Sequence, residues 1–407
     1  MKRAKKVKKV QKDKSAFPLA SIKVIGVGGG GGNAVSRISR DFARGVEFIA
    51  VNTDHQDLDH CDVRRRVYIG KNLTRGLGTG MNPDLGRQAA EENRSELTEL
   101  VKGADLVFIA AGLGGGTGTG VSPVVAEAAK QSGALTIAFV TKPFAFEGSQ
   151  RQRIAEEGIV RLKDKVDALI VVPNDRIFAV VNKDTPVIKA FEAIDDVMKN
   201  ALQGLVELII TPGIINVDFA DVRSVMQDGG SAIVGMGVAA GAERAVNAVN
   251  QALHSPLLEV NPEGAKSVLL GISGGRDLRI NEVNEAAKLV AQTVDPGAKI
   301  IFGAYHDRRL KHNQLRITLV ATGFNGMSSS LSLFSSNRFG EERMRPVFGG
   351  AEEKLRLGDT DKAEAELAAA KPPLAGSGEA AKAEKAAKNK KDSDAWDFPT
   401  FLRKKRR

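Results

Sequence analysis

The fold is decided by the sequence AAGLGGGTGTG at residues 110–120. The apolar segment that overlaps its start, residues 105–111, predicts a buried strand, and the residues from Val121 onward predict a helix. Glycine lets backbone N–H groups approach an anion closely, because it has no Cβ and tolerates positive φ. Backbone N–H groups at the N-terminus of a helix bind anions readily. This stretch therefore predicts a phosphate-binding loop between a strand and a helix.

A second glycine cluster, GVGGGGGN at residues 26–33, overlaps the end of another predicted strand. It satisfies the pattern G-x-G-x-x-G of dinucleotide-binding proteins, and Asp54 stands about 20 residues further on, where a ribose-binding carboxylate is expected. A dinucleotide fold needs one such loop, whereas this chain has two, and the sequence G-x-x-x-x-G-K-[ST] of a P-loop is absent. We therefore expect a nucleoside triphosphate held by backbone dipoles and a magnesium ion. A dinucleotide-dependent oxidoreductase is the alternative.

Predicted strands and helices alternate along the first half of the chain. Strands are predicted at residues 22–27, 46–51, 105–111, 135–140 and 168–172, and helices at 33–44, 84–102, 121–132 and 150–164. This order favours a mostly parallel sheet covered on both faces. A long helix is predicted at residues 185–210, and a second part follows with a helix at 242–253 and strands at 267–273, 299–305 and 315–322. For this part we expect a smaller, mixed sheet.

The net charge of +10 comes from the two ends of the chain. Residues 1–14 carry +7 and residues 403–407 carry +5, which leaves −2 for everything between them. The predicted folded part is therefore not basic, and we expect no nucleic-acid partner. The single cysteine, Cys61, excludes a disulfide framework and a cysteine-rich zinc site, and no dedicated metal site is expected. No apolar run reaches the roughly 18 residues that a membrane span needs, so we expect no direct membrane insertion.

Several segments resemble the tubulin/FtsZ family. The sequence GGGTGTG at residues 114–120 matches the tubulin signature, and the surrounding residues narrow the resemblance to the FtsZ branch, the bacterial tubulin-like cell-division GTPases. The similar segments are VIGVGGGGGN (24–33), VNTD (51–54), GLGTGMNP (76–83), VFIAAGLGGGTGTGV (107–121), VTKPFAFEG (140–148), PND (173–175) and NVDFADVR (216–223). The resemblance covers residues 22–324 and resumes at 394–403.

The resemblance implies a tubulin-like α/β fold. A Rossmann-like GTPase domain with a mostly parallel sheet would be joined by a long central helix to a smaller α+β domain with a mixed sheet. The expected division is a basic disordered tail at 1–20, the GTP-binding domain at 21–184, the central helix at 185–210, the C-terminal domain with the catalytic loop at 211–325, a disordered linker at 326–391 and a partner-binding peptide at 392–407.

The resemblance also implies a site for GTP or GDP with Mg²⁺. The loop that contains Met81 would sense the terminal phosphate, and the ring of Phe191 would stack on the purine. Asp195 would accept hydrogen bonds from N1 and N2 of guanine, which adenine cannot donate. The residues expected to contact the nucleotide are Gly29, Gly30, Gly31, Gly32, Asn33, Asn52, Asp54, Thr79, Gly80, Met81, Gly114, Gly115, Gly116, Thr117, Gly118, Thr119, Glu147, Arg151, Asn174, Phe191 and Asp195.

Asn216, Asp218 and Asp221 follow the predicted long helix. The spacing of these three residues by itself fits a solvated surface turn as well as it fits a catalytic loop. The resemblance implies that this loop enters the GTP site of the next subunit and polarises the attacking water. Such a head-to-tail contact builds open filaments. The implied function is GTP-dependent assembly of the cytokinetic ring at the bacterial division site, with hydrolysis driving filament turnover.

The sequence DFPTFLR at residues 397–403 resembles the short peptide by which this family binds membrane tethers and division regulators. Apolar side chains beside a stiffening proline suit docking in an apolar groove. The residues expected to bind partners are Asp397, Phe398, Pro399, Phe401, Leu402 and Arg403. The implied location is the cytoplasm, at the division site beneath the inner membrane.

Two departures from the family pattern concern the nucleotide site. Met81 stands where a smaller residue is usual, and Ser149 and Gln150 stand where a basic residue is common. Two family alternatives are also open: a tubulin-like protein with another task, such as plasmid segregation, and a homologue that does not hydrolyse GTP. The terminal peptide speaks against the first, and the presence of both Asp218 and Asp221 speaks against the second.

Overall fold

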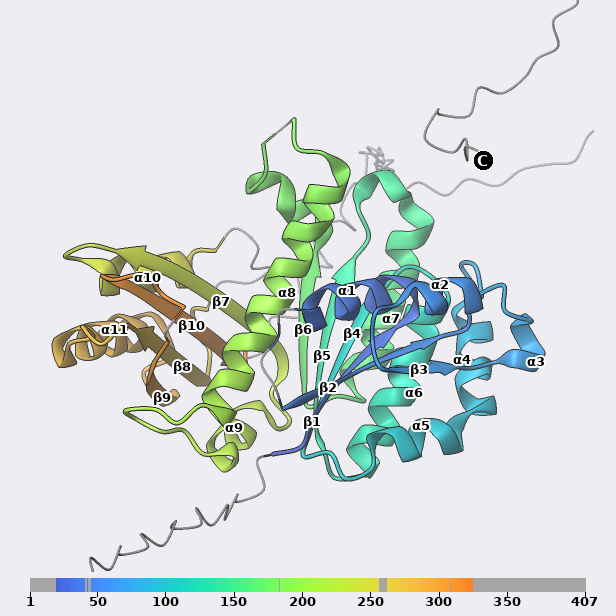
Figure 1. Cartoon of the computed structure of the whole chain (residues 1–407), viewed down its shortest axis with the longest axis horizontal. Helices are drawn as coiled ribbons and strands as arrows, with labels where there is room; N and C mark the ends of the chain where they lie inside the picture. Colours follow the sequence, from blue (N-terminus) through green and yellow to red (C-terminus); the bar gives the residue numbers. More distant parts are fainter. Residues whose placement is uncertain are drawn as a thin grey trace, which may run out of the picture. The chain divides into compact units, whose positions relative to one another are not determined.

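The computed structural model describes residues 20–324, except 41, 43–44, 183, 256–261 and 308. Within this part of the chain, ten strands form one sheet in the order β3–β2–β1–β4–β5–β6–β7–β10–β8–β9 (Figure 1). The strands are β1 (Ile22–Val27), β2 (Val46–Asn52), β3 (Arg65–Tyr68), β4 (Leu106–Gly112), β5 (Leu135–Lys142), β6 (Ala168–Pro173), β7 (Gly230–Ala240), β8 (Ser267–Gly274), β9 (Lys299–His306) and β10 (Gln314–Thr322). Residues 1–19 of the expected tail, the expected linker and the expected C-terminal peptide lie outside the described residues.

The helices are α1 (Gly28–Arg40), α2 (His55–His60), α3 (Lys71–Thr74), α4 (Pro83–Glu92), α5 (Arg94–Val101), α6 (Thr117–Gln131), α7 (Ser149–Lys163), α8 (Val187–Ile210), α9 (Phe219–Met226), α10 (Arg244–Leu253) and α11 (Ile280–Thr293). Two short 3₁₀ helices, η1 (Ala145–Glu147) and η2 (Asn174–Ala179), follow β5 and β6. The predicted long helix is confirmed as α8, which begins after Pro186. The single helix predicted at 84–102 is two helices, α4 and α5, separated by Asn93.

The first half of the sheet is parallel, as predicted. β1 pairs in parallel with both β2 and β4, and the pairs β2–β3, β4–β5 and β5–β6 are also parallel. The side chains of β1 are buried along its whole length, since helices cover both faces of this part of the sheet. One core packs against α1 and α8, and the other packs against α4, α5, α6 and α7.

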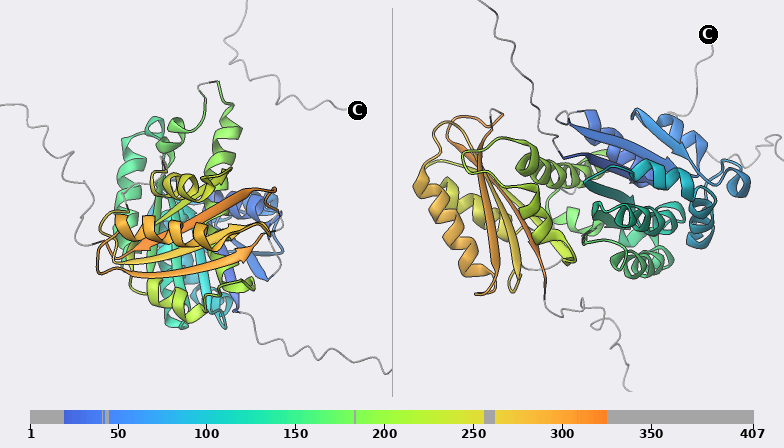
Figure 2. Two further views of the ribbon diagram at one scale, coloured as in Figure 1. Left: turned by 90° about the vertical axis from the view of Figure 1, so that its left-hand side faces the viewer. Right: turned by 90° about the horizontal axis from the view of Figure 1, so that it is seen from below.

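The second half is mixed, also as predicted, but it is not a separate sheet. β10 lies antiparallel between β7 and β8, and β8 pairs in parallel with β9. The start of β7 pairs in parallel with β6, over residues 230–232, and this short ladder joins the two halves. Helices α10 and α11 pack on one face of the second half, while α8 packs on the other (Figures 1 and 2).

Strand β7 was missed by the sequence analysis because glycines interrupt its apolar pattern. A Cβ atom on Gly235 would lie 2.0 Å from the carbonyl oxygen of Ala252, and one on Gly237 would lie 1.9 Å from that of Ala248. Both carbonyl groups belong to α10. The glycines therefore let this helix pack directly on the backbone of β7, which side-chain periodicity cannot reveal. β3, α2, α3, α9 and α11 were also not predicted, and most of them are short.

Two helices begin earlier than predicted, within the glycine clusters. α1 begins at Gly28 rather than at residue 33, and α6 begins at Thr117 rather than at Val121. Glycine has a low helix propensity, so the sequence pattern favoured loops there. As β1 and β4 are parallel neighbours, the N-termini of α1 and α6 lie at the same edge of the sheet. The fold therefore brings together the two segments that were predicted to bind phosphate.

Candidate nucleotide-binding site

The two glycine clusters touch each other through their backbones. Gly28 has a φ of +70°, and a Cβ atom on it would lie 2.9 Å from the backbone nitrogen of Gly118. Gly29 is half-buried, and Gly30 and Asn33 are exposed. Gly31 is buried against β4, and Gly32 is buried beside Cys61. The first turns of α1 and α6 therefore point unpaired N–H groups toward one place. Such an arrangement can hold a phosphate chain without a lysine.

Three threonine hydroxyls meet beside these helix starts. The Oγ1 atom of Thr117 lies 2.7 Å from that of Thr53 and 2.9 Å from that of Thr79. The backbone N–H of Gly116 also donates to the carbonyl oxygen of Gly80 at 2.7 Å. These bonds connect the glycine loop at residues 114–119 to residues 79–80. Such a connection suits segments that are both predicted to contact the nucleotide. The contact of Thr53 was not predicted, although it lies within the segment 51–54 that resembles the family.

The side chains of Asn52 and Asp54 are used to build the turn after β2. The Oδ1 atom of Asn52 accepts from Thr53 N at 2.8 Å, and its Nδ2 atom donates to Asp57 Oδ2 at 2.8 Å. Asp54 caps α2 by accepting from the backbone nitrogen of Asp57 at 3.1 Å. The Asp57 carboxylate lies beside the first glycine cluster, since a Cβ atom on Gly29 would lie 2.6 Å from its Oδ2. Sequence reasoning missed Asp57.

An aromatic cluster lies beyond the ends of β5 and β6. The buried ring of Phe144 contacts Phe191 at 5.5 Å, Phe178 at 5.6 Å and Phe146 at 4.8 Å between ring centroids. Phe191 remains 42% exposed, so one part of its ring is free to stack on a base. At the start of η2, the Oδ1 atom of Asn174 is buried and has no hydrogen-bond partner among the described residues. A buried acceptor of this kind requires a donor that a ligand or water supplies.

Glu147 and Arg151 connect this cluster to the second glycine loop. Glu147 accepts from the backbone nitrogen of Phe144 at 3.0 Å and forms an ion pair of 3.0 Å with Arg151. A Cβ atom on Gly114 would lie 2.8 Å from the carbonyl oxygen of Arg151. The structure therefore places residues 144–151 beside the glycine loop at residues 114–120.

Asp195 on α8 pairs with Arg37 on α1, a residue that was not predicted. Burial raises the pKa of the Asp195 carboxyl above the ordinary 3.8, although the hydrogen bond and charge of Arg37 oppose this shift. The pair ties the start of α8 to the helix that begins at Gly28. Sequence spacing held no signal for Arg37, because the two residues are 158 positions apart.

The structure does not bring Asn216, Asp218 and Asp221 to this place. They follow the C-terminal end of α8, whereas Phe191 and Asp195 lie near its N-terminal end. Asp218 caps α9, and its backbone N–H donates to Asp221 Oδ2 at 3.1 Å. The 24 residues of α8 span about 36 Å at 1.5 Å per residue. Within one chain the acidic loop is therefore far from the glycine clusters.

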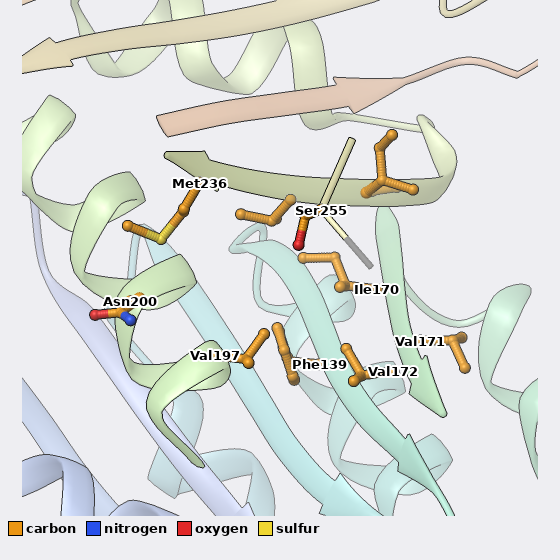
Figure 3. A pocket seen from close by; sticks show the side chains of 11 residues that line it. Phe139, Ile170, Val171, Val172, Val197, Asn200, Met236 and Ser255 are labelled. Atoms are coloured by element: carbon orange, nitrogen blue, oxygen red, sulfur yellow. The ribbon is translucent and has the colours of Figure 1, made fainter. Parts of the chain in front are cut away.

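An apolar pocket beside α8 is not part of this site. It has a volume of about 190 Å³ and lies between β6, β7 and α8 (Figure 3). Its lining is mostly aliphatic, with Asn200 and Ser255 as its polar side chains, and none of the predicted nucleotide-contacting residues lines it. Among the described residues, no group of three or more His, Cys, Asp or Glu side chains is arranged to hold a metal ion. No helix in the described part is long and apolar enough to cross a membrane.

The fold and the site define an α/β protein in which two glycine-rich helix starts lie side by side, an arrangement suited to the phosphates of a nucleotide. The model of the Tubulin/FtsZ family GTPase domain matches residues 21–182, and the model of the FtsZ family C-terminal domain matches residues 230–325. The chain belongs to the tubulin/FtsZ family. The predicted α/β tubulin-like fold is thereby confirmed. Membership of a GTPase family speaks against the alternative of a dinucleotide-dependent oxidoreductase.

Solved structures agree with this assignment. The chain is 46% identical to FtsZ from M. jannaschii, described as an empty dimer, with a TM-score of 0.71 over 75% of this chain and 89% of that chain. A point mutant of the same M. jannaschii protein matches with the same identity and TM-score over 92% of its chain. CetZ2 from Haloferax volcanii, a GTPγS-bound protofilament, is 24% identical with a TM-score of 0.66 over 77% of this chain and 96% of its own, and shows the shared fold alone.

Proposed function

We propose that this protein binds GTP between α1 and α6, assembles head to tail into filaments, and hydrolyses GTP at the contact between subunits. One observation carries the proposal: Asp218 and Asp221 are separated from the glycine clusters by the length of α8. A second subunit stacked along this axis would bring its acidic loop onto the nucleotide of the first. Membership of a GTPase family supports the reaction itself.

In this mechanism the protein contributes mainly position and charge. The N–H groups at the starts of α1 and α6 hold the phosphates, and Asn174 with Asp195 reads the guanine edge. The neighbouring Asp218 and Asp221 orient the attacking water. Mg²⁺ usually binds through nucleotide phosphates and waters, and the hydroxyl groups around Thr117 fit such a loosely held ion. When bound, the ion neutralises charge on the phosphates.

The rest of the proposal follows the family. We propose the domain division given by the sequence, with the GTP-binding domain at 21–184, the helix at 185–210 and the C-terminal domain at 211–325. The filaments would form a division ring in the cytoplasm at the membrane, held there by partners that bind the peptide at 392–407. The fold does not by itself indicate a bacterial host, because CetZ2 from Haloferax volcanii, an archaeal protein, shares it.

The test is phosphate release from GTP with Mg²⁺, measured across a series of protein concentrations beside sedimentation of polymer. We expect turnover per molecule to be close to zero at low concentration and to rise at the concentration where polymer appears. Constant turnover per molecule at all concentrations would mean that each chain carries a complete site, and the shared site would have to be abandoned. GDP in place of GTP is the matched control for assembly.

A further inference from the structure

The loop that carries Asn216 and Asp218 alternates between exposed and inward-facing residues. Ile214, Asn216 and Asp218 are exposed, whereas Ile215 is half-buried and Val217 is 8% exposed. Alternation with a period of two is the pattern of an extended segment lying on a surface. Asn216 and Asp218 therefore face outward because their neighbours are anchored inward.

The anchor is the outer edge of β9. Ile215 and Ala304 exchange two backbone hydrogen bonds of 3.0 Å, and together they form an isolated antiparallel bridge. The backbone nitrogen of Ile214 also donates to Ala304 at 2.7 Å. Antiparallel pairing fixes the register of the loop against the strand. A slip by one residue would turn Asn216 and Asp218 inward.

Gly303, the residue before Ala304, provides the space into which Val217 packs. A Cβ atom on Gly303 would lie 2.7 Å from Cγ2 of Val217, 3.1 Å from Cδ2 of Leu208 and 3.4 Å from the carbonyl oxygen of Ile215, so Val217 is its closest neighbour. Valine has little freedom to turn away, because its side chain is branched at Cβ. Any side chain at position 303 would therefore push Val217, and with it the backbone that leads to Asp218.

We propose that Gly303 is a positioning residue for GTP hydrolysis, because the contact between Gly303 and Val217 sets where Asp218 stands on the face offered to the next subunit. This inference rests on the proposed function. Positioning dominates phosphoryl transfer, and a misplacement of about 1 Å can cost on the order of 100-fold in rate. Gly303 lies on β9 and is not a nucleotide contact, so its effect should fall on turnover rather than on GTP affinity.

The experiment compares Gly303→Ala with two further variants. Gly271→Ala is the matched control, since Gly271 is paired with Gly303 in the sheet but its Cβ would meet only Leu208 of α8, at 3.2 Å. The double variant Gly303→Ala/Val217→Ala removes the methyl group that causes the clash. Each is assayed for GTP affinity, for sedimented polymer and for phosphate release per sedimented subunit.

We expect Gly303→Ala to bind GTP with wild-type affinity and to lose roughly 10- to 100-fold in turnover per sedimented subunit. The double variant should recover at least about tenfold of this loss, and Gly271→Ala should remain within about twofold of wild type. Wild-type turnover in Gly303→Ala, or no recovery in the double variant, would overturn the proposal. If Gly303→Ala does not fold, Val217→Ala alone decides: lower turnover at unchanged GTP affinity supports the proposal, and unchanged turnover overturns it.

Asp218→Ala, assayed in parallel, separates this inference from the function on which it rests. Full turnover in Asp218→Ala would remove the shared catalytic site, whatever Gly303→Ala does. An inactive Asp218→Ala beside a fully active Gly303→Ala would leave the shared site in place and overturn the positioning role alone.

Discussion

Gly28 and Gly118 meet backbone to backbone, with 2.9 Å between the position of a Cβ on Gly28 and the nitrogen of Gly118. The two residues belong to different glycine clusters and to the starts of different helices, α1 and α6. Their contact joins into one surface the two sequence motifs, about 90 residues apart, that we propose to bind phosphate. Gly28 also has a left-handed backbone conformation at this contact, with a φ of +70°.

The first prediction concerns this contact. Gly28→Ala introduces both a close contact and a strained backbone, so we expect a loss of about 1–3 kcal/mol in the free energy of unfolding. Gly30→Ala is the matched control, because a Cβ there would lie at an ordinary 3.5 Å from Gly112. It should keep the stability of the wild type while weakening GTP binding, since Gly30 is exposed at the start of α1. Denaturant unfolding and GTP titration of both variants check this, and equal stability of the two would contradict it.

The sequence predicted the parallel core and the glycine sites because both follow local rules. β4 is apolar over its whole length and β1 is apolar except at Lys23. Glycine repeats after a strand indicate phosphate binding whatever the rest of the chain does. The contacts of Arg37 with Asp195 and of Thr53 with Thr117 could not be predicted, since they join residues that are far apart in sequence. Nor could the space that Gly303 leaves for Val217, because it depends on how a loop lies against the edge of a sheet.

The second prediction is that Asp218→Ala separates binding from hydrolysis. Asp218 lies at the opposite end of α8 from the glycine clusters, so GTP affinity should match the wild type. Turnover should fall by at least about 100-fold if the carboxylate orients the attacking water. Mixing Asp218→Ala with a variant that cannot bind GTP should restore some turnover, because some of the mixed contacts then pair an intact acidic loop with an intact nucleotide site. Full turnover in Asp218→Ala alone would show that the carboxylate is not catalytic.

The third prediction concerns the C-terminal peptide. Deleting residues 394–407 should leave polymer yield and GTP turnover unchanged, because the resemblance assigns this segment to partner binding. The same deletion should abolish capture of a membrane-tether protein in a pull-down. A deletion of equal length within 340–353 is the control and should retain capture. Retained capture by the protein that lacks 394–407 would place the partner site elsewhere.

The fourth prediction is a pH dependence of guanine recognition. Because burial raises the pKa of Asp195 above 3.8, the carboxylate becomes protonated at a higher pH than an exposed aspartate. A protonated carboxyl accepts hydrogen bonds from guanine poorly, so affinity for GDP should fall as the pH is lowered toward that raised pKa. In the Asp195→Asn variant GDP should bind more weakly and without this step. Calorimetric titration of the wild type and of Asp195→Asn with GDP, from about pH 8 down to about pH 4, checks both expectations. If the two proteins showed the same change of affinity with pH, the role of Asp195 in guanine recognition would be contradicted.

The raised pKa of Asp195 also affects the stability of the fold in the absence of nucleotide, and its pH dependence there is opposite to that of nucleotide binding. A raised pKa means that the folded chain holds the Asp195 proton more tightly than the unfolded chain does. The contribution of this group to the free energy of unfolding therefore falls as the pH rises from 3.8 through the raised value. Nucleotide binding and stability should thus respond to the titration of Asp195 in opposite directions.

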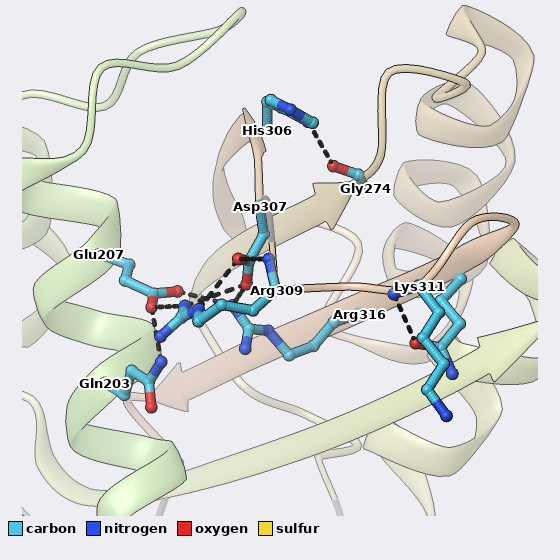
Figure 4. A network of polar contacts seen from close by, with 9 residues as sticks. Gln203, Glu207, Gly274, His306, Asp307, Arg309, Lys311 and Arg316 are labelled. Carbon is cyan, nitrogen blue, oxygen red and sulfur yellow. Dashed lines mark hydrogen bonds and ion pairs between the residues drawn. The ribbon is translucent and has the colours of Figure 1, made fainter. Parts of the chain in front are cut away.

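A network of charges that is buried except at Arg309 joins α8 to the second half of the sheet (Figure 4). Arg316 donates to Glu207 at 2.6 Å and to Asp307 at 2.8 Å, and Arg309 pairs with both carboxylates. The side chains of Glu207 and Arg316 are 7% and 12% exposed. Burial alone would raise the pKa of Asp307, but the hydrogen bonds and charges of the two arginines outweigh it and hold the pKa below 3.8. This stabilisation is present above pH 3.8 and is lost as the pH falls through the lowered pKa.

The fifth prediction follows from the burial of this network. Glu207→Ala leaves Arg316 buried with one partner fewer, and breaking a buried pair in this way typically costs about 3–5 kcal/mol of the free energy of unfolding. Glu207→Gln keeps the shape and one oxygen acceptor without the charge, so its loss should be smaller than that of Glu207→Ala. Glu157→Ala is the control, since its ion pair with Arg153 joins side chains that are 51% and 83% exposed, and exposed pairs contribute at most about 1 kcal/mol. Urea unfolding of the three variants measures the loss of free energy of unfolding in each and so checks the expected order. Equal stability of Glu207→Ala and Glu157→Ala would mean that α8 is held to the second half of the sheet by apolar packing, with the charges contributing little.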